Sequence, residues 1–342
     1  MALFSKKLIH LKIKGNKVLS LLDINSNLKR LSLPQLTNYK VCNPSIALKG
    51  NSLLVTYKGV SFDLREEGYC YKSGVLQMPC ADTQNYYAEV SSNFEIKKNI
   101  FIEDRYIRSH PNAYNAITDL RIFKWRGKWC VLGAAVTHII DEETQLPIRK
   151  TTMALCELVD QRLRLICFLP SRQLHEKNWM PWVVDNELFL IYSSHPFEIL
   201  KFDGEQLIPF KIEEGLNLED QRGGSCVIPY QDKFIAVVHK KIFVEDNGSG
   251  AAIKNFFYTH SVVVYDKGFN AIGASPEFTF ESESVEFCAG LAITNRDIIL
   301  SYGIWDSEAV LLKLPIRDFF DALNLSGVIS PKRSKLFNYW QS

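Results

Sequence analysis

The chain has 342 residues, 46% of them hydrophobic and 23% charged, which is typical of a globular protein and excludes extended disorder. Its 40 Lys and Arg against 38 Asp and Glu give a net charge of +2, which does not indicate a nucleic-acid-binding protein. No apolar run could span a bilayer, and residues 1–20 lack the apolar core of a signal peptide, so we expect a cytoplasmic protein.

The first predicted strand covers residues 8–14, where apolar and polar residues alternate. We expect this strand to pair with the last sheet, because an open sheet edge invites aggregation. The rest of the chain consists of short apolar runs between Gly, Asn and Asp turns, without long patterns of helical period. The segment from 61 to 116 shows no clean hairpin, and we expect it to hold outer strands and a loop.

Five hairpin units recur along the chain, each with an apolar strand, a tight polar turn and a second, more hydrophobic strand. They lie near 45–57, 120–133, 180–192, 225–239 and 289–302. A further strand-like run follows each unit, so the repeat predicts an all-β fold, a five-bladed β-propeller in one domain over 1–342. An irregular β-sandwich or barrel is the alternative. One short helix is predicted near 316–324, before a tail over 326–342.

Polar residues at the ends of the inner strands are candidates for a site, because inner strands line the central channel of a propeller. Asn43 opens the first hairpin and Lys58 ends it. Asp119 and Arg121 enter an apolar strand two residues apart, so alternation places them on one face. The structural alternatives are an ordinary Asn-Pro turn and a surface ion pair.

The later units carry further candidates. Lys177 and Asn178 lie beside Trp179 and Trp182, which could stack on a sugar, or else be packed beneath an exposed loop. The remaining candidates are Arg222 before Gly223-Gly224, His239, Tyr258 and Asp306. Paired glycines let backbone N–H groups approach a ligand closely, although they also occur in ordinary turns.

Metal and cofactor motifs do not stand out in the sequence. Eight cysteines lie without any Cys-x-x-Cys pair, which indicates reduced, buried thiols rather than a zinc site or a disulfide framework. Phosphate loops, dinucleotide-binding glycine motifs, calcium loops and nucleophile elbows do not occur. We therefore expect no metal and no other cofactor.

The order of these motifs resembles glycoside hydrolase family 130, whose members are five-bladed propellers, chiefly β-mannoside phosphorylases, with a related group of β-mannosyltransferases. The resemblance spans about 43–313 and rests on Asn43-Pro44, Asp119-x-Arg121, Lys177-Asn178, Gly223-Gly224, His239, Tyr258 and Tyr302-Gly303-x-x-Asp306. The sequences that follow Arg222, Glu286 and Ser301 are also similar to glycosyltransferases of surface polysaccharides.

The resemblance implies a role for several residues. The family's acid belongs to a Glu-Asp-Pro-Arg motif and matches Asp119, with Thr118 and Leu120 in place of Glu and Pro. The basic residue that closes the first hairpin is usually Arg in the family and is Lys58 here. Arg can donate two parallel hydrogen bonds to a phosphate, whereas Lys acts as a point charge. The family's phosphate-contacting Lys, His and Tyr match Lys177, His239 and Tyr258.

The chemistry that these residues support is transfer at an anomeric carbon, which needs a carboxyl group to move a proton. One acid, several cations and no obvious second carboxylate favour phosphate-linked transfer over hydrolysis. The predicted catalytic residue is Asp119, and the predicted substrate or phosphate ligands are Asn43, Lys58, Arg121, Lys177, Asn178, Arg222, His239, Tyr258 and Asp306.

The expected partners are a sugar donor, either a nucleotide sugar or a sugar 1-phosphate, and a carbohydrate acceptor. The favoured function is an inverting glycosyltransferase that makes a β-linked surface glycan. A β-mannoside phosphorylase and a non-catalytic propeller that binds glycan or protein are the alternatives. An exposed apolar patch around Trp179 and Trp182 would favour the binding propeller, whereas a deep basic pocket would favour catalysis.

Overall fold

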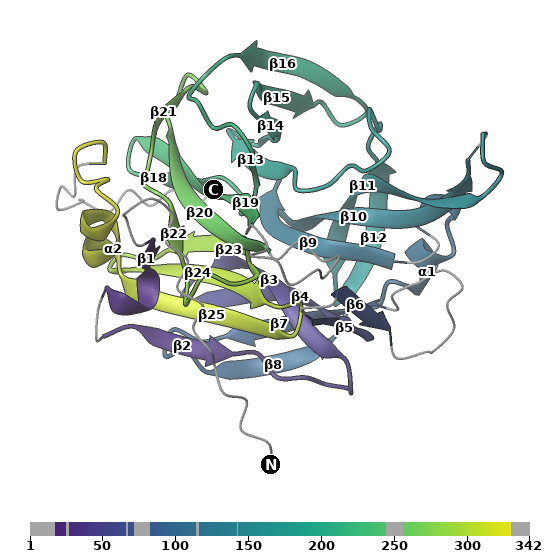
Figure 1. The fold of residues 1–342 in the computed structure, drawn as a ribbon, viewed down its shortest axis with the longest axis horizontal. Coiled ribbons are helices and arrows are strands. Elements are labelled where there is room, and N and C mark those ends of the chain that lie inside the picture. Colours follow the sequence, from purple (N-terminus) through teal and green to yellow (C-terminus); the bar gives the residue numbers. More distant parts are fainter. Residues whose placement is uncertain are drawn as a thin grey trace, which may run out of the picture.

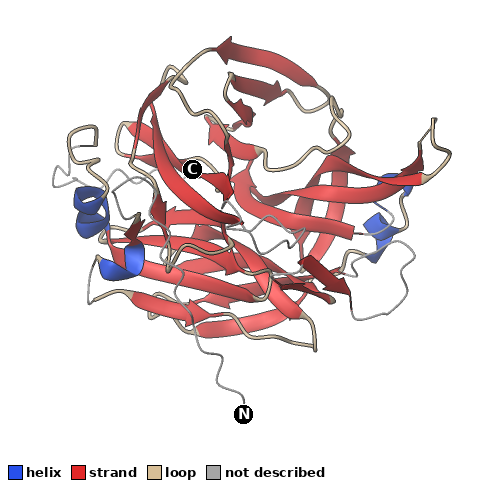
Figure 2. Cartoon of the chain, in the orientation of Figure 1, coloured by secondary structure: helices blue, strands red, loops and turns tan. Residues whose placement is uncertain are grey.

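The protein is described by a computed structural model that covers residues 18–24, 27–65, 68–71, 83–113, 116–141, 143–243 and 256–329. Strands dominate this part of the chain, and the helices are short (Figure 2). Sheets are arranged around a central axis as in a propeller (Figure 1), so the predicted all-β propeller class is confirmed. The predicted strand 8–14 lies outside the described residues, and that 1–342 form one domain stays a prediction.

Five sheets of four or more strands make up the ring in the described ranges, and we number them blades 1 to 5. Blade 1 holds β3 (Lys40–Lys49), β4 (Ser52–Val60), β7 (Thr83–Val90) and β8 (Ile96–Phe101). Blade 2 holds β9 (Ala116–Trp125), β10 (Lys128–Ile140), β11 (Pro147–Val159) and β12 (Arg162–Phe168). Blade 3 holds β13 (Met180–Val184), β14 (Glu187–Ser194), β15 (Phe197–Phe202) and β16 (Leu207–Glu213).

The last two blades each include a strand from the N-terminal part of the chain. Blade 4 holds β17 (Gln221–Gly223), β18 (Ile228–Tyr230), β19 (Lys233–Phe243), β20 (Phe256–Tyr265), β21 (Ala271–Ala274), β22 (Phe278–Thr279) and β1 (Leu19–Ser20). Blade 5 holds β23 (Glu286–Ile293), β24 (Asp297–Ile304), β25 (Glu308–Pro315) and β2 (Lys29–Ser32). Each predicted hairpin falls on the inner strands of one blade.

The ring is closed by β2, which pairs antiparallel with β25. Arg30 of β2 binds Glu281 at 2.8 Å and Glu308 at 2.9 Å, so the closing strand is also held by two ion pairs. Because these pairs are only partly buried, most of the closure comes from the strand pairing itself.

The expectation that 61–116 holds outer strands is confirmed by β7 and β8 of blade 1, but the expectation that it lacks a clean hairpin is wrong. This segment contains the β5 (Phe62–Arg65) and β6 (Gly68–Tyr71) hairpin, and a second hairpin joins β7 to β8. The outermost strand β8 is half-exposed and carries lysines among its apolar residues, so its hydrophobic signal is weak in the sequence.

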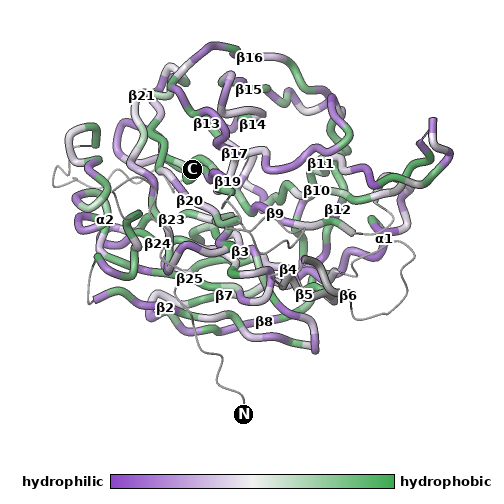
Figure 3. Tube along the Cα trace, viewed as in Figure 1, coloured by the Kyte–Doolittle hydropathy of each residue, from purple (hydrophilic) through white to green (hydrophobic). Residues whose placement is uncertain are grey.

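The core consists of apolar side chains packed between neighbouring blades. Hydrophobic segments, green in Figure 3, occur in the strands of the sheets, and inner strands such as β4 are buried almost throughout, as expected for sheets that pack on both faces. The predicted C-terminal helix is confirmed as α2 (Ile316–Ala322), which buries Phe319 and Phe320 against blades 4 and 5. The remaining helical segments are η1 (Leu21–Asp23), α1 (Arg105–Arg108) and η2 (Pro111–Ala113). Within the described segments, no helix is long and apolar enough to cross a membrane.

Candidate active site

Asn43 and Asp119 occupy equivalent positions near the start of the innermost strands β3 and β9. Both have left-handed backbone, with φ of 50° and 55°, and the strand register slips at both places. Asn and Asp tolerate this conformation better than other non-glycine residues. The two bulges re-aim these side chains, so that Asn43 Nδ2 donates a hydrogen bond of 2.8 Å to Asp119 Oδ1.

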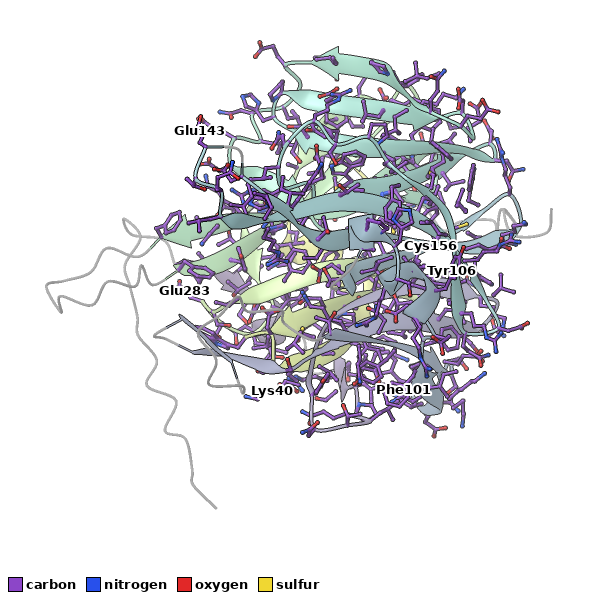
Figure 4. All side chains as sticks on the ribbon, turned by 90° about the vertical axis from the view of Figure 1, so that its right-hand side faces the viewer. Lys40, Phe101, Tyr106, Glu143, Cys156 and Glu283 are labelled. Atoms are coloured by element: carbon purple, nitrogen blue, oxygen red, sulfur yellow. The ribbon has the colours of Figure 1, made fainter. Side chains whose placement is uncertain are left out.

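The ends of the blades that bear this site share one face of the ring. Glu143 follows β10, in which Ala134, Ala135 and Val136 pair with the start of β9, and Glu283 precedes β23. Both residues lie on the left in Figure 4, away from Phe101 and Tyr106. The polar strand ends of blades 2 and 5 therefore open to the same side.

Lys58 and Asp119 form an ion pair across blades 1 and 2. The Lys58 Nζ to Asp119 Oδ1 distance is 3.0 Å, and the two side chains are 11% and 25% exposed. Burial alone would raise the pKa of Asp119, but the Lys58 charge, the Asn43 hydrogen bond and the Arg121 charge lower it to about 2. Asp119 is therefore a carboxylate at neutral pH.

Arg121 is buried and connects residues of several blades. Its Nε donates to the Gly224 carbonyl oxygen at 2.7 Å, and its Nη2 donates to Asn178 Oδ1 at 3.4 Å. Its Nη1 donates to the carbonyl oxygen of Asp119 at 3.3 Å, and the guanidinium lies 5.8 Å from the Phe287 ring centroid. With 1% exposure, Arg121 fixes the positions of its neighbours, and direct contact with phosphate stays a prediction.

Beside Asn178, blades 3 and 4 enclose a cavity of about 350 Å³, which we call the cationic cavity. It is lined by Gln173, His175, Lys177, Asn178, Tyr192, Ser193, Ser194, Gln221, Arg222 and Gly223, with no acidic side chain among them. Desolvation and the charges of Arg222 and Arg149 lower the pKa of Lys177. Repulsion between neighbouring cations is relieved when an anion binds, so the cavity is suited to phosphate.

Arg149 is a cation that the sequence analysis missed. It lies exposed on β11, close enough to Lys177 to lower its pKa. Its position in a long hairpin carries no motif, so only the folded path of that hairpin brings it near the cavity.

His239 and Tyr258 come from the paired strands β19 and β20. The His239 ring is 3% exposed and meets the rings of Tyr258 and Phe287 edge-on, at 5.3 and 4.9 Å. Burial, followed by the charges of His260, Arg121 and Arg222, lowers its pKa well below the usual value. His239 is therefore neutral at pH 7, so it does not supply the positive charge that a phosphate-contacting histidine could carry. Its Nδ1 is buried without a hydrogen-bond partner among the residues described.

Asp306 brings a second carboxylate to the Lys58 side of the site. It follows Trp305 in the turn between β24 and β25, and both residues have left-handed backbone. Burial, followed by the charge of Asp306, raises the pKa of Cys42, and Asp306 also acts to raise the pKa of Lys58. The site therefore holds two acids close to one lysine, where the sequence suggested a single clear acid.

The glycines of two motifs allow close approach of the chain. A Cβ on Gly223 would lie 1.9 Å from the Asn178 carbonyl oxygen, and one on Gly303 would lie 2.3 Å from Asn43 Oδ1. Any side chain at Gly223 would push the Asn178 segment out of place, and one at Gly303 would displace the partner of Asp119.

Of the two alternatives for Trp179 and Trp182, packing beneath a loop is confirmed and stacking on a sugar is not. They are 1% and 0% exposed. Trp179 packs edge-on against Tyr192, and Trp182 packs against Phe234. Trp182 of β13 and Trp179, which precedes this strand, lie in two core clusters between blades, so they form no exposed aromatic patch. Across the described ranges, no group of three His, Cys, Asp or Glu side chains could hold a metal ion.

No protein-family model and no curated protein matches the sequence. Among solved structures, β-1,2-mannobiose phosphorylase from Listeria innocua superposes with a TM-score of 0.56 at 10% identity, over 87% of this chain and 99% of that one. The GDP-Man-dependent mannosyltransferase MPT-1 from Leishmania mexicana superposes with a TM-score of 0.55 at 10% identity, over 84% of this chain and 89% of that one. A third structure belongs to work reporting that the GH130 family of mannoside phosphorylases contains glycoside hydrolases that target β-1,2-mannosidic linkages in Candida mannan. It superposes with a TM-score of 0.56 at 12% identity, over 82% of this chain and 85% of that one. The chain therefore shares the propeller fold of enzymes that act on mannosides.

Proposed function

We propose that this protein transfers a glycosyl group between a phosphate-bearing donor and a hydroxyl group of a carbohydrate acceptor. The observation that carries the proposal is the ionised Asp119, held by Lys58 and Asn43 beside a cavity lined by cations and by no acid. The fold shared with a mannoside phosphorylase and a mannosyltransferase supports the same reaction class.

In the proposed reaction, the acceptor hydroxyl attacks the anomeric carbon of the donor sugar. Asp119 takes the hydroxyl proton as the new C–O bond forms, and the bond to the phosphate oxygen breaks with its electron pair leaving on the phosphate. Lys177 and Arg222 stabilise the negative charge that develops on this leaving group. The anomeric configuration inverts, because bond formation and departure occur on opposite faces of the sugar.

A mannoside phosphorylase would use the same groups in the opposite direction, with Asp119 as the acid. The low pKa of Asp119, about 2, keeps this group ionised in the free protein, which is the form that a proton acceptor needs, whereas a phosphorylase must first protonate it. The non-catalytic binding propeller is less favoured, because Trp179 and Trp182 are buried and form no exposed patch. A β-linked surface glycan as product and a cytoplasmic location remain parts of the proposal.

The direct test incubates the protein with sugar 1-phosphates or nucleotide sugars and a panel of acceptors, and measures released phosphate or nucleotide. Release from nucleotide sugars only supports a transferase, and release from sugar 1-phosphates only supports a phosphorylase. If no donor reacts but the protein binds glycans on an array, the binding propeller is the better explanation.

Asp119→Asn is expected to lower turnover about 10²–10⁴-fold, because it removes the proton acceptor while its volume hardly changes. Circular dichroism should show an unchanged sheet signal. Asp232→Asn, at an exposed turn, is the matched control and should keep full turnover. An Asp119→Asn protein that turns over like the control would rule out Asp119 as the catalytic group.

A further inference from the structure

The hairpin of β10 and β11 continues beyond the rest of blade 2 as a two-stranded ribbon (Figure 1). Strand β9 pairs with β10 only as far as Val136, and β12 pairs with β11 only as far as Ala154. By contrast, β10 and β11 stay paired out to Ile140 and Pro147. The outer part of β11 therefore has a strand edge that β12 does not cover.

The loop that lines the cationic cavity pairs with this edge. The backbone N–H of Thr151 donates to the Leu174 carbonyl oxygen at 3.0 Å, and the N–H of Glu176 donates to the Thr151 carbonyl oxygen at 3.1 Å. The two bonds form a parallel bridge between Thr151 and His175. Paired residues direct their side chains to the same face, so this face of β11 adjoins His175, which lines the cavity.

Arg149 lies on the same face of β11 as Thr151, two residues or about 7 Å further along the strand. This face is directed toward blade 3, because Met153 and Leu155, which continue the alternation, pack in one core cluster with Leu188. The Arg149 side chain is exposed at the end of this face. The strand therefore directs Arg149 toward the side of the cavity rather than away from it.

Three cations of three blades come together in this way: Arg149 of blade 2, Lys177 before blade 3 and Arg222 of blade 4. None of them forms an ion pair with an acidic side chain in the part of the chain that the structure describes. Desolvation, followed by the charges of Arg222 and Arg149, lowers the pKa of Lys177, in agreement with their proximity. An anion bound among the three would relieve this repulsion.

We infer that Arg149 binds the phosphate of the donor as a third cationic ligand, which the β10–β11 ribbon supplies beside Lys177 and Arg222. The inference rests on the proposed function and adds blade 2 to the phosphate site. Arg149 is not among the residues that line the cavity, so its side chain makes this contact when an anion is bound. Its guanidinium can donate two parallel hydrogen bonds to a phosphate, which Lys177 cannot.

Isothermal titration calorimetry with inorganic phosphate and with pyrophosphate tests this inference without any need for turnover. We expect Arg149→Gln to weaken the binding of pyrophosphate by about tenfold or more, because a charge-assisted hydrogen bond is lost. Arg149→Lys should bind with intermediate affinity, since it keeps the charge but not the two parallel bonds.

Lys150→Gln is the matched control. Lys150 is the next residue of β11 and carries the same charge, but it lies on the opposite face of the strand, where it pairs with Thr137. This variant should keep the pyrophosphate affinity of the unaltered protein. Thermal melts will show that each variant is folded, which we expect because Arg149 is exposed.

The outcomes separate the inference from the proposed function. Full affinity in Arg149→Gln, or equal losses in Arg149→Gln and Lys150→Gln, would overturn the inference. If Lys177→Gln loses pyrophosphate binding while Arg149→Gln keeps it, the inference fails and the proposed function stands. An unaltered protein that binds neither anion would count against the cationic cavity itself, and so against both.

Discussion

Two loops of the propeller, residues 169–178 and 280–285, are each held by a buried glutamate, but only the first brings side chains into the cationic cavity. In the first loop Glu176 is 3% exposed and accepts the backbone N–H groups of Arg172 and Gln173 at 2.6 and 2.8 Å. Its other oxygen accepts the indole N–H of Trp179 at 3.2 Å. The carboxylate therefore fixes both the loop and the core residue beneath it.

The second loop has the same arrangement with a different outcome. Glu286 is fully buried and accepts the backbone N–H of Phe280 at 2.7 Å, and those of Glu281 and Ser282 at 3.0 Å. This loop contributes no residue to the cationic cavity, whereas the first contributes Gln173, His175, Lys177 and Asn178. A buried glutamate thus shapes a loop between blades, and the residues beside it decide whether the loop has a role in binding.

The largest expected effect comes from Gly223→Ala, which disturbs the first loop alone. The added Cβ would lie 1.9 Å from the Asn178 carbonyl oxygen, so the loop must move. We expect a loss of about 3 kcal/mol in the free energy of unfolding and loss of pyrophosphate binding, measured by denaturant unfolding and calorimetry. Gly273→Ala, whose Cβ would lie 3.3 Å from a Val328 side-chain carbon, is the control and should do little to either.

Replacing each of the two glutamates by glutamine tests directly whether the two loops differ in function. Glu176→Gln and Glu286→Gln should each lower the free energy of unfolding by about 2 kcal/mol, because an amide cannot accept all of these hydrogen bonds. Only Glu176→Gln should also weaken pyrophosphate binding, by about tenfold, since only its loop lines the cavity. Equal binding losses in both variants would show that the two loops do not differ in function.

The smallest effect is a pH dependence specific to the second loop. Burial raises the pKa of Glu286 to about 7, although its backbone hydrogen bonds act to lower it. The folded protein then binds more protons than the unfolded chain between the usual carboxyl pKa and about 7. The contribution of Glu286 to stability is therefore complete at low pH and is lost as the pH rises through about 7.

Unfolding measured from pH 5 to pH 8 should show wild type losing about 1–2 kcal/mol of stability relative to Glu286→Gln, which does not titrate. Wild type and variant curves that run parallel over this range would contradict the raised pKa. The Glu176→Gln protein serves as a comparison for the loss of a buried carboxylate elsewhere in the ring.

The fold could be predicted because each blade repeats a hairpin whose inner strands are strongly apolar. The bounds of outer strands such as β8 could not be predicted from an apolar pattern, because these strands are half-exposed and mix Lys with Ile. The closing strand β2 was not predicted either, since its sequence Lys-Arg-Leu-Ser has almost no apolar pattern.

The site was predictable to the extent that motifs at strand ends identify it. Asn43, Lys58 and Asp119 do meet, because equivalent positions of neighbouring blades adjoin in a closed ring. The sequence left open whether Trp179 stacks on a sugar or packs beneath a loop, since this depends on the path of the chain before β13. The loop contacts of Glu176 were equally hidden, because they depend on the path of the loop rather than on a spacing.

The pairing of β2 with β25 sets the order in which the molecule can be completed. Blades 2 and 3 are each built from consecutive strands and can form as the chain is synthesised. Blade 5 needs both Lys29–Ser32 and Glu308–Pro315, which pair although most of the other blades lie between them in the sequence. Before β25 has formed, β2 lacks the strand with which it pairs. A chain that stops short of residue 315 therefore cannot close the ring completely. Such a chain would present open strand edges to its neighbours, so ring closure is the step at which nascent chains are most exposed to aggregation.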